Sequence, residues 1–547
     1  MGITIEQIRE GVIGERQLFE TAFGPKPMIY ADYTASGRSL SFVEDAINQH
    51  VLPFYANTHS ETSFTGKQST QYREQAREAI HSALNTSDKH KVIFAGSGAT
   101  AAINKLIDML NLRLPAELNS EYQFESQIKE ADKPVVFIGP YEHHSNELPW
   151  RESIATLVTI PLDDKGQIDI AYLESQLRHY QNRPKLIGSF SAASNVTGLK
   201  TDVTKVSALL NRYNAMSCWD YAAAAPYVGI DMQADKLDAV FISTHKFIGG
   251  PGTPGLLVVN ADHLKNKVPA VPGGGTVMYV TPDSHTFIEN VERREEGGTP
   301  SIVESIRAGL VFKIQQQIGT DKIEALEQNF IERAIERLSK LDNFEILGSK
   351  DAKRLSILSF NIKHQDTVLH YGFVVALLND LFGIQARGGC SCAGPYGHEL
   401  LDLSPTTSSA IEGQLHNGYM VLRPGWTRLN FNYFIDEFTF EYMLAALTMI
   451  AEQGWRLLAS YQFNQTLGTW EYVSDFEPAT LSLDDLLEVD LYDANGLKTP
   501  QVEHAQMLEQ YLVQAEYILS SAQVNATAEP LKLSRDAQKL RWFAVAE

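Results

Sequence analysis

Short apolar runs alternate with helical segments between about residue 90 and residue 260, and this alternation constrains the fold more than any other feature of the sequence. The runs with the length of buried strands are 92–95, 135–139, 186–190, 216–219, 239–243 and 256–259. Between several of them the apolar residues recur at helical spacing, as in 102–110. Strands that alternate with helices predict an α/β fold with a mostly parallel sheet, in which ligands bind at the carboxyl ends of the strands.

A second, smaller α+β domain is predicted after this region. Its expected elements are one long helix over 301–341, a strand over 355–362, a helix over 367–382, a strand over 427–431 and a helix over 437–453. The segment 395–424 reads as a long loop, and long loops tend to be functional or disordered. The tail carries an acidic patch over 475–493 and then an amphipathic helix over 502–522.

These patterns predict four parts of the chain. We expect an N-terminal segment over 1–45 that packs with the small domain, a large domain over 46–314, a small domain over 315–455 and a C-terminal extension over 456–547. A chain of 547 residues is long enough for such a division.

Charge and cysteine content exclude some partners and indicate a compartment. The formal net charge of −21 argues against nucleic acid or an anionic membrane as a partner, because both would repel the chain. The sequence has no apolar window of about 18 residues and no signal-like start. Three cysteines cannot build a disulfide framework, which favours a reducing compartment, and we expect a cytoplasmic protein.

Lys246 is the residue that most strongly indicates a chemistry. It ends the run Ser243-Thr244-His245-Lys246 after an apolar strand, and a glycine-rich stretch over 249–255 follows it. A lysine beside a hydroxyl, an imidazole and backbone without bulk suits a Schiff base to pyridoxal phosphate. A lysine after a strand is more often an exposed surface residue, so the interpretation depends on partners elsewhere in the chain.

A candidate phosphate site follows the first predicted strand. The run Gly96-Ser97-Gly98-Ala99-Thr100 opens a helix, so its amides and the Thr100 hydroxyl can bind a phosphate dianion. A dinucleotide fingerprint is the alternative, because Gly96, Gly98 and Ala101 fit its pattern. That pattern expects an acid about 20 residues later, whereas the next strand ends about 40 residues on, which disfavours a nicotinamide cofactor.

Two further strand ends carry residues suited to a pyridine ring. His143, in Glu142-His143-His144-Ser145-Asn146, can stack on a flat ring and move protons near neutral pH. Asp220 can keep a pyridine nitrogen protonated. Capping or metal-binding histidines and a helix-capping aspartate are the structural alternatives.

The order of these motifs, with Ser194-Asn195-Val196-Thr197-Gly198 and Gly298-Thr299-Pro300, resembles the class V aminotransferase group of pyridoxal phosphate enzymes. The resemblance covers about residues 30–449 and is strongest to the cysteine desulfurase and selenocysteine lyase branch. It implies fold type I, the aspartate aminotransferase-like architecture of a large mostly parallel-sheet domain and a smaller α+β domain.

The resemblance also implies roles for individual residues. Lys246 would form the Schiff base, Asp220 would pair with the pyridine nitrogen and His143 would stack on the ring. The phosphate would be held by Ala99, Thr100, Ser243 and His245, and Asn195 would lie near the ring hydroxyl and the substrate. Thr299 would reach the phosphate of a neighbouring subunit, which implies a homodimer with shared active sites. Ala223 stands where desulfurases usually have a glutamine, so the tuning of the ring stays open.

The substrate chemistry is predicted to lie in the small domain. In Arg387-Gly388-Gly389-Cys390-Ser391-Cys392, an arginine precedes a cysteine by five residues, as in the desulfurase loop. The resemblance makes Cys392 the nucleophile, and Arg387 and Arg428 the clamp for an amino acid carboxylate. Surface salt bridges are the alternative for both arginines.

The second thiol of this loop departs from the family pattern. Cys390 stands where desulfurases of this branch more often have histidine, and the arrangement is more like the desulfurase-type domain of molybdenum-cofactor sulfurases. Zinc held by Cys390, Cys392 and His398 would have only three ligands, so we expect no metal. Cys218 lies in an apolar strand and reads as core.

These inferences predict an enzyme that converts cysteine to alanine and passes sulfur to Cys392 as a persulfide, and then to a sulfur-acceptor protein. The alternative is a class V aminotransferase, epimerase or carbon-sulfur lyase acting on another amino acid or an amine, which Ala223 and the loop after Cys392 would favour. A third reading is a non-catalytic module that binds pyridoxal phosphate.

Overall fold

The computed structural model describes residues 2–58, 60–474, 476, 480, 482–488, 501–522 and 531–546. The chain forms two compact units. The large unit comprises Met1–Val12, Thr34–Ala325 and Asp351–Leu355, and the small unit comprises Ile13–Tyr33, Leu326–Lys350 and Ser356–Glu547. The predicted N-terminal segment is thus divided between the two units.

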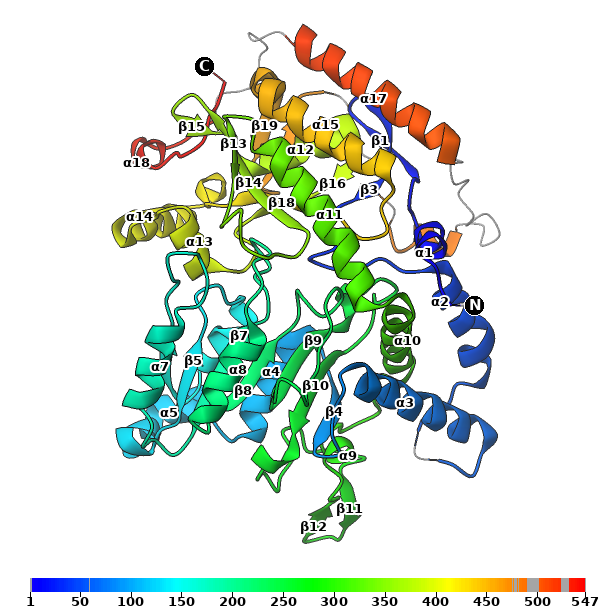
Figure 1. Cartoon of the computed structure of the whole chain (residues 1–547), viewed down its shortest axis with the longest axis vertical. Coiled ribbons are helices and arrows are strands. Elements are labelled where there is room, and N and C mark those ends of the chain that lie inside the picture. Colours follow the sequence, from blue (N-terminus) through cyan, green and yellow to red (C-terminus); the bar gives the residue numbers. More distant parts are fainter. Residues whose placement is uncertain are drawn as a thin grey trace. The chain divides into compact units, whose positions relative to one another are not determined.

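A seven-stranded sheet forms the centre of the large unit (Figure 1). Its strands, in spatial order, are β4 (His90–Ala95), β10 (Gly255–Asn260), β9 (Ala239–Ser243), β8 (Met216–Asp220), β7 (Leu186–Ser191), β5 (Val135–Ile138) and β6 (Thr156–Thr159). Among them β10 is antiparallel to both of its neighbours, and the others run parallel. The predicted α/β fold with a mostly parallel sheet is confirmed. The strand β6 was not predicted, because its half-exposed edge position gives it no continuous apolar run.

Amphipathic helices cover this sheet. They include α4 (Gly98–Met109), α7 (Ile170–His179) and α8 (Val203–Arg212). In α4 the side chains of Ile103, Leu106 and Ile107 are fully buried in one cluster with the sheet. Because strands β5, β7, β8 and β9 are parallel, their carboxyl ends lie along one edge of the sheet, and the loops that follow them can form a site there.

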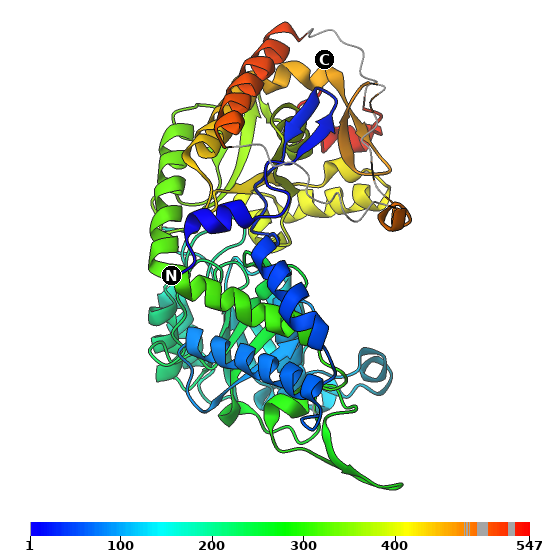
Figure 2. The ribbon, with the colours of Figure 1, turned by 90° about the vertical axis from the view of Figure 1, so that its right-hand side faces the viewer.

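Two long helices of the large unit, α3 (Phe64–Ala83) and α10 (Ile302–Ile318), pack side by side (Figure 2). A Cβ placed on Gly309 of α10 would lie 2.5 Å from the Cβ of Ala76 in α3. The glycine and the alanine therefore permit the close approach of the two helix backbones.

The small unit is built on an antiparallel sheet and a layer of helices, as the α+β prediction expects. Its sheet has the order β13 (Phe344–Ile346), β14 (Ile357–His364), β18 (Trp426–Asn430) and β17 (Arg387–Gly389), with β15 (Thr367–Val368) paired to β14. The helices α12 (Tyr371–Phe382) and α15 (Glu437–Gln453) share one apolar core with this sheet. The short strand β3 (Ile29–Tyr30) pairs in parallel with β16 (Ile384–Gln385), so N-terminal residues belong to this unit.

Three secondary-structure predictions were wrong in detail. The single helix expected over 301–341 is two helices, α10 and α11 (Thr320–Leu338), because Gly319 between them has φ 87°. The loop expected over 395–424 contains α13 (Gly394–Leu400) and α14 (Pro405–His416). Ser404 caps α14 by accepting a hydrogen bond from the amide of Thr407, and Pro405 takes the first helical position. The helix expected from residue 367 begins at Tyr371, since 367–368 pairs as β15.

The extension folds onto the small unit. The predicted helix over 502–522 is confirmed as α17 (Gln501–Ser521), which packs on α15. The hairpin β19 (Tyr461–Asn464) and β20 (Thr469–Tyr472), α16 (Asp485–Glu488) and α18 (Arg535–Lys539) complete its described part. Much of the acidic patch over 475–493 lies outside the described residues. Within the residues that the structure describes, none of the helices has the length and apolar character needed to cross a membrane.

Other elements connect these parts. They are α1 (Ile5–Gly11), β1 (Leu18–Thr21), β2 (Gly24–Pro27), α2 (Ser41–Ala46), α5 (Ala116–Tyr122), α6 (Leu148–Arg151), β11 (Val277–Val280), β12 (His285–Phe287) and α9 (Val291–Glu295).

Candidate active site

The loops at the carboxyl edge of the large sheet form a small cradle at the start of α4. The hydroxyl of Ser243 accepts a hydrogen bond from the amide of Ala99 at 2.9 Å. Gly98 has φ 58°, and a Cβ there would lie 2.9 Å from the Ser243 Oγ and 3.6 Å from the His245 Nε2. The cradle therefore joins the two sequence motifs that were predicted to bind phosphate, and it leaves room for no side chain at residue 98.

Thr100 and His143 are connected through a residue to which the sequence analysis gave no role. The Oγ of Ser145 lies 2.6 Å from the Thr100 Oγ1 and 3.0 Å from the His143 Nδ1. The amide of Ser145 donates to the same Nδ1 at 3.1 Å. Because Nδ1 accepts a backbone proton, the neutral His143 ring carries its own proton on Nε2. The pair Thr100 and Ser145 thus fixes both the orientation and the tautomer of the imidazole.

Asp220 and His245 both experience the charge of Lys246. Asp220 ends β8 with 4% exposure, and burial raises the pKa of its carboxyl, while the amide of Ala222 and the charge of Lys246 lower it. Burial and, to a smaller extent, the charge of Lys246 together lower the pKa of His245 to about 4. His245 is therefore neutral at pH 7, so its free ring nitrogen can accept a hydrogen bond or donate one without carrying charge.

A second buried carboxyl, that of Glu142, lies beneath this edge. It accepts hydrogen bonds from the Gly139 and Ser191 amides, the Ser191 hydroxyl and the Asn146 side chain, at 2.6 to 3.1 Å. Burial raises the pKa of Glu142 to about 7, and the charge of Asp220 also raises it. Glu142 ties the end of β5 to the end of β7. Glu142 stands in the predicted histidine motif, but its position there gave no indication of this role.

The lysine loop is held by a short segment that the sequence analysis missed. The amide of Gly37 donates to the His245 carbonyl at 2.8 Å, and the Ser36 Oγ lies 3.3 Å from the His245 Nδ1. A Cβ on Gly37 would lie 1.9 Å from the carbonyl oxygen of Phe247, so only glycine fits. In the sequence this segment is a run of small residues, Ala35-Ser36-Gly37, which is too short to predict a contact with a residue 209 positions away.

The remaining predicted residues of the large unit lie as follows. Asn195 follows β7 and is 8% exposed, and the nearby Ala192 amide donates to the Asp220 carbonyl at 2.9 Å. Ala223 is 7% exposed in the turn after Asp220. Thr299 is exposed and lines a surface hollow with Leu52, away from the cradle residues described above.

In the small unit, Arg387 and Arg428 are directly opposite each other on β17 and β18. Like charges at such positions repel, and Asp32 offsets the repulsion. Its Oδ1 accepts from the Arg428 Nη2 at 2.9 Å, and its Oδ2 lies 3.9 Å from the Arg387 Nε. Arg428 is buried, which lowers the pKa of its guanidinium, whereas Arg387 is 53% exposed. The structure thus brings both predicted arginines together around a carboxylate that the sequence analysis missed.

The two cysteines of the loop occupy one tight turn after β17. The amide of Ala393 donates to the Cys390 carbonyl at 3.2 Å, and Ser391 and Cys392 have φ values of 54° and 56°. Two successive non-glycine residues in this left-handed region are strained, at a cost of about 1 kcal/mol or more each. Cys392 is exposed and Cys390 is half-buried, whereas Cys218 is buried in β8, where burial raises the pKa of its thiol. Cys392 is therefore the accessible thiol of the turn.

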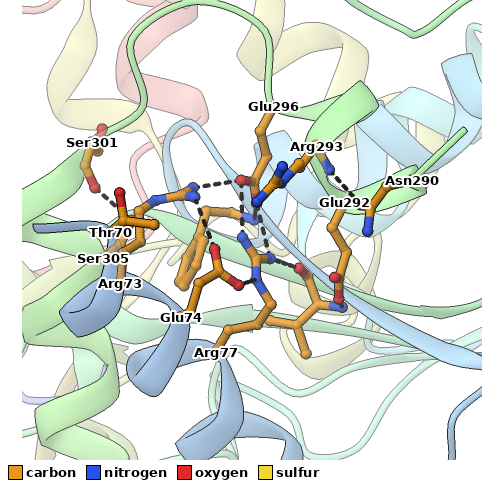
Figure 3. A network of polar contacts seen from close by, with 12 residues as sticks. Thr70, Arg73, Glu74, Arg77, Asn290, Glu292, Arg293, Glu296, Ser301 and Ser305 are labelled. Carbon is orange, nitrogen blue, oxygen red and sulfur yellow. Dashed lines mark hydrogen bonds and ion pairs between the residues drawn. The ribbon is translucent and has the colours of Figure 1, made fainter. Parts of the chain in front are cut away.

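A buried ion-pair network anchors the segment that leads to Thr299 (Figure 3). Glu296 binds the guanidinium groups of Arg73 and Arg77 from α3, at 2.5 and 3.1 Å, with all three side chains at most 5% exposed. Glu296 also accepts a hydrogen bond from the amide of Phe94 on the edge strand β4 at 2.8 Å. The network covers that strand edge and fixes the start of Gly297-Gly298-Thr299.

Replacing Glu296 with glutamine is expected to lower the free energy of unfolding by about 3 kcal/mol, because two buried guanidinium groups lose their counter-charge. Chemical denaturation measures the change. Glu74→Gln is the matched control, since Glu74 pairs with the same arginines but its side chain is 44% exposed, and its loss should cost about 1 kcal/mol or less. Equal effects of the two substitutions would contradict the buried-network interpretation.

In the part of the chain that the structure describes, no group of three His, Cys, Asp or Glu side chains is arranged to hold a metal ion.

Comparisons with known proteins agree with this arrangement. A family model described as Aminotransferase class-V matches residues 29–407. A probable cysteine desulfurase of Halalkalibacterium halodurans is 30% identical over 389 residues, which cover 70% of this chain and 88% of the relative. One from Staphylococcus aureus is 27% identical over 388 residues, covering 70% and 87%. The chain therefore belongs to the class V aminotransferase family.

Solved structures show the same fold. An apo cysteine desulfurase from Thermococcus onnurineus has a TM-score of 0.63 at 23% identity, covering 78% of this chain and 95% of its own. A cysteine desulfurase from Escherichia coli has a TM-score of 0.63 at 20% identity, covering 82% and 99%. At these identities the likeness concerns the fold, and the chemistry must be argued from the residues.

Proposed function

We propose that this protein is a pyridoxal phosphate-dependent cysteine desulfurase, which converts L-cysteine to L-alanine and takes up the sulfur on Cys392 as a persulfide. The observation that carries the proposal is the exposed Cys392 thiol in a strained turn, five residues after Arg387. The names of the curated relatives support it.

The residues of the large unit fit the cofactor. The amides at the start of α4, with the Thr100 and Ser243 hydroxyls and neutral His245, suit a phosphate dianion. Asp220 is a buried carboxyl whose pKa burial raises, and a pyridinium nitrogen beside it would stabilise its ionised form. His143 has a fixed ring that suits stacking, and Asn195 would lie beside the ring. Pyridoxal phosphate, when bound, supplies an electron sink for the α-carbon of an amino acid.

The side chains of the protein would then divide the work. Lys246 would hold the cofactor covalently and move the α-proton of the substrate through its Nζ. Arg428 and Arg387 would bind the substrate carboxylate, and Asp32 keeps both guanidinium groups oriented for this task. The Cys392 Sγ would bond to the sulfur of the substrate while the carbon–sulfur bond breaks. The electron pair of the broken bond would go to the β-carbon, which takes up a proton in place of the one that the Cys392 thiol gives up. The α-carbon would regain a proton to give alanine, and the transferred sulfur would keep its hydrogen in the persulfide.

The proposal includes a homodimer with shared active sites, in which Thr299 contacts the phosphate of the partner subunit. Large apolar side chains support it, because Phe64 of α3 and Met278 and Tyr279 of β11 are 65%, 69% and 68% exposed. Light scattering should give the mass of two chains, and the mass of one chain at micromolar concentration would contradict the dimer.

Two neighbouring thiols in an exposed turn stay reduced in the cytoplasm, which we propose as the compartment.

Alanine formation tests the proposed activity most simply. The holoenzyme with L-cysteine and a thiol reductant should release alanine and sulfide in equal amounts. A second candidate is turnover of another small amino acid, which buried Ala223 favours because no glutamine there can tune the ring. Turnover of such an amino acid, with no alanine formed from cysteine or selenocysteine, would replace the desulfurase proposal. In the desulfurase case a sulfur-acceptor protein would take the persulfide sulfur from the exposed Cys392.

A further inference from the structure

The C-terminal extension contributes to a packed aromatic cluster at the start of α12. The region that matches the family model ends at residue 407, before the extension begins. His370 caps α12 and is 2% exposed. Its ring stacks on Trp542 at 5.3 Å between centroids and meets the edge of Phe543 at 4.8 Å. We call His370, Tyr371, Trp470, Trp542 and Phe543 the aromatic brace.

Hydrogen bonds also hold the aromatic brace in place. The Trp470 Nε1 donates to the His370 Nδ1 at 3.0 Å, and the Trp542 Nε1 donates to the Leu422 carbonyl at 3.0 Å. The amide of Ala544 donates to the Val368 carbonyl at 2.9 Å. Burial lowers the pKa of His370 to about 3, so its ring stays neutral and accepts the indole proton. Residues 542–544 are therefore a fixed part of the small unit.

Tyr371 connects the brace to the strand that precedes the cysteine turn. Its ring stacks on Trp542 at 6.0 Å with an interplanar angle of 20°. A Cβ on Gly388 of β17 would lie 2.6 Å from this ring, and one on Gly425 would lie 2.8 Å from it. Burial raises the pKa of Tyr371 to about 12, so its phenol stays protonated at neutral pH. The indole of Trp542 thus supports a ring that supports β17.

The turn after β17 needs such support. Ser391 and Cys392 hold left-handed backbone conformations that persist only where the surrounding structure enforces them. On one side of the turn is β17, which Tyr371 covers. On the other side is α13, where a Cβ on Gly397 would lie 3.2 Å from the buried indole of Trp426. Loosening β17 would let residues 391 and 392 relax to ordinary φ values and would move the Cys392 thiol.

We infer that the C-terminal extension positions Cys392, because Trp542 braces Tyr371 against the strand that leads into the strained cysteine turn. The inference rests on the proposed role of Cys392 as sulfur acceptor. Trp542 is a positioning residue, since it acts on the thiol through Tyr371 and β17. The extension thereby gives this chain a support for its reactive loop that lies outside the region matched by the family.

The test compares full-length holoenzymes that carry Trp542→Ala, Trp542→Phe and Trp455→Ala. Trp455 is the matched control, because it is also a half-buried indole of the small unit but stacks on His364 at 5.2 Å and does not belong to the aromatic brace. Trp542→Ala should speed amide hydrogen exchange in residues 387–393 and lower kcat for cysteine about tenfold with little change in KM. The absorbance of the bound cofactor should not change. Trp542→Phe keeps a stacking ring and should restore most of the turnover.

The outcomes separate this inference from the proposed activity. If Trp542→Ala fails to fold, Trp470→Phe, which removes one hydrogen bond but keeps a ring, should show a smaller increase in exchange over residues 387–393. The inference would be overturned if amide exchange in residues 387–393 were as slow in Trp542→Ala as in Trp455→Ala. Exchange in Trp470→Phe equal to that of the unmodified chain would overturn it as well. A wild-type enzyme that forms no alanine from cysteine would refute the activity alone, and the exchange rates would still decide whether the extension braces the turn.

Discussion

Replacing Cys392 with alanine is expected to abolish sulfide release from cysteine, with a fall in rate of ~10³-fold or more, because the group that bonds to the substrate sulfur is removed. Cys392 is the exposed thiol of the turn, whereas Cys390 is half-buried and Cys218 is buried. Steady-state assay of alanine and sulfide measures the loss.

Cys390→Ser is the matched control for this prediction. It removes a thiol two positions away but keeps the turn and the exposed Cys392, so most of the activity should remain. Mass spectrometry after a single turnover without reductant should find the added sulfur atom on the peptide at Cys392. Full activity of Cys392→Ala, or sulfur found on Cys390 instead, would contradict the assignment.

Replacing Lys246 with alanine is expected to lower turnover by ~10³-fold or more, because the substitution removes both the covalent attachment of the cofactor and the base that moves the α-proton. The charge of Lys246 lowers the pKa of Asp220 and of His245, two of the residues predicted to surround the ring. The cradle of Ala99, Ser243 and Thr100 is untouched, and the variant should still bind pyridoxal phosphate without a covalent bond.

Two measurements distinguish this role from a structural one. A small primary amine added to Lys246→Ala should recover part of the activity, since it can replace the missing amino group. Lys200→Ala is the control, because Lys200 pairs with Glu324 at a distance of 2.5 Å on the same unit and has no proposed role in the reaction. Wild-type turnover by Lys246→Ala would refute the proposed chemistry.

Local signals in the sequence were sufficient to predict most strands of the large sheet and the candidate site residues that follow them. Apolar runs predicted β4, β5, β7, β8, β9 and β10, and parallel strands bring their carboxyl ends to one edge. Gly319 at the end of α10, and Ser404 and Pro405 at the start of α14, are signals of helix ends that the sequence also contains. The prediction gave more weight to the apolar pattern, so it missed these two helix ends.

The missed residues share a physical reason. Asp32 binds Arg428 across 396 positions, and Ser36 contacts His245 across 209 positions. Contacts of this kind depend on the packing of distant segments, which periodicity and spacing do not encode. Glu142 was visible in its motif, yet two of its four hydrogen-bond donors belong to Ser191, which lies 49 positions away. The contacts of the extension with α12 were unreadable for the same reason.

The central claim is that Lys246 carries pyridoxal phosphate, and borohydride reduction of the holoenzyme followed by peptide mapping tests it most directly. Reduction fixes the cofactor as a stable pyridoxyl group on the amine that holds it. The account predicts one pyridoxyl group per chain, on the peptide that contains Lys246. A pyridoxyl group on another lysine, or none on any peptide of an enzyme saturated with the cofactor, would contradict it.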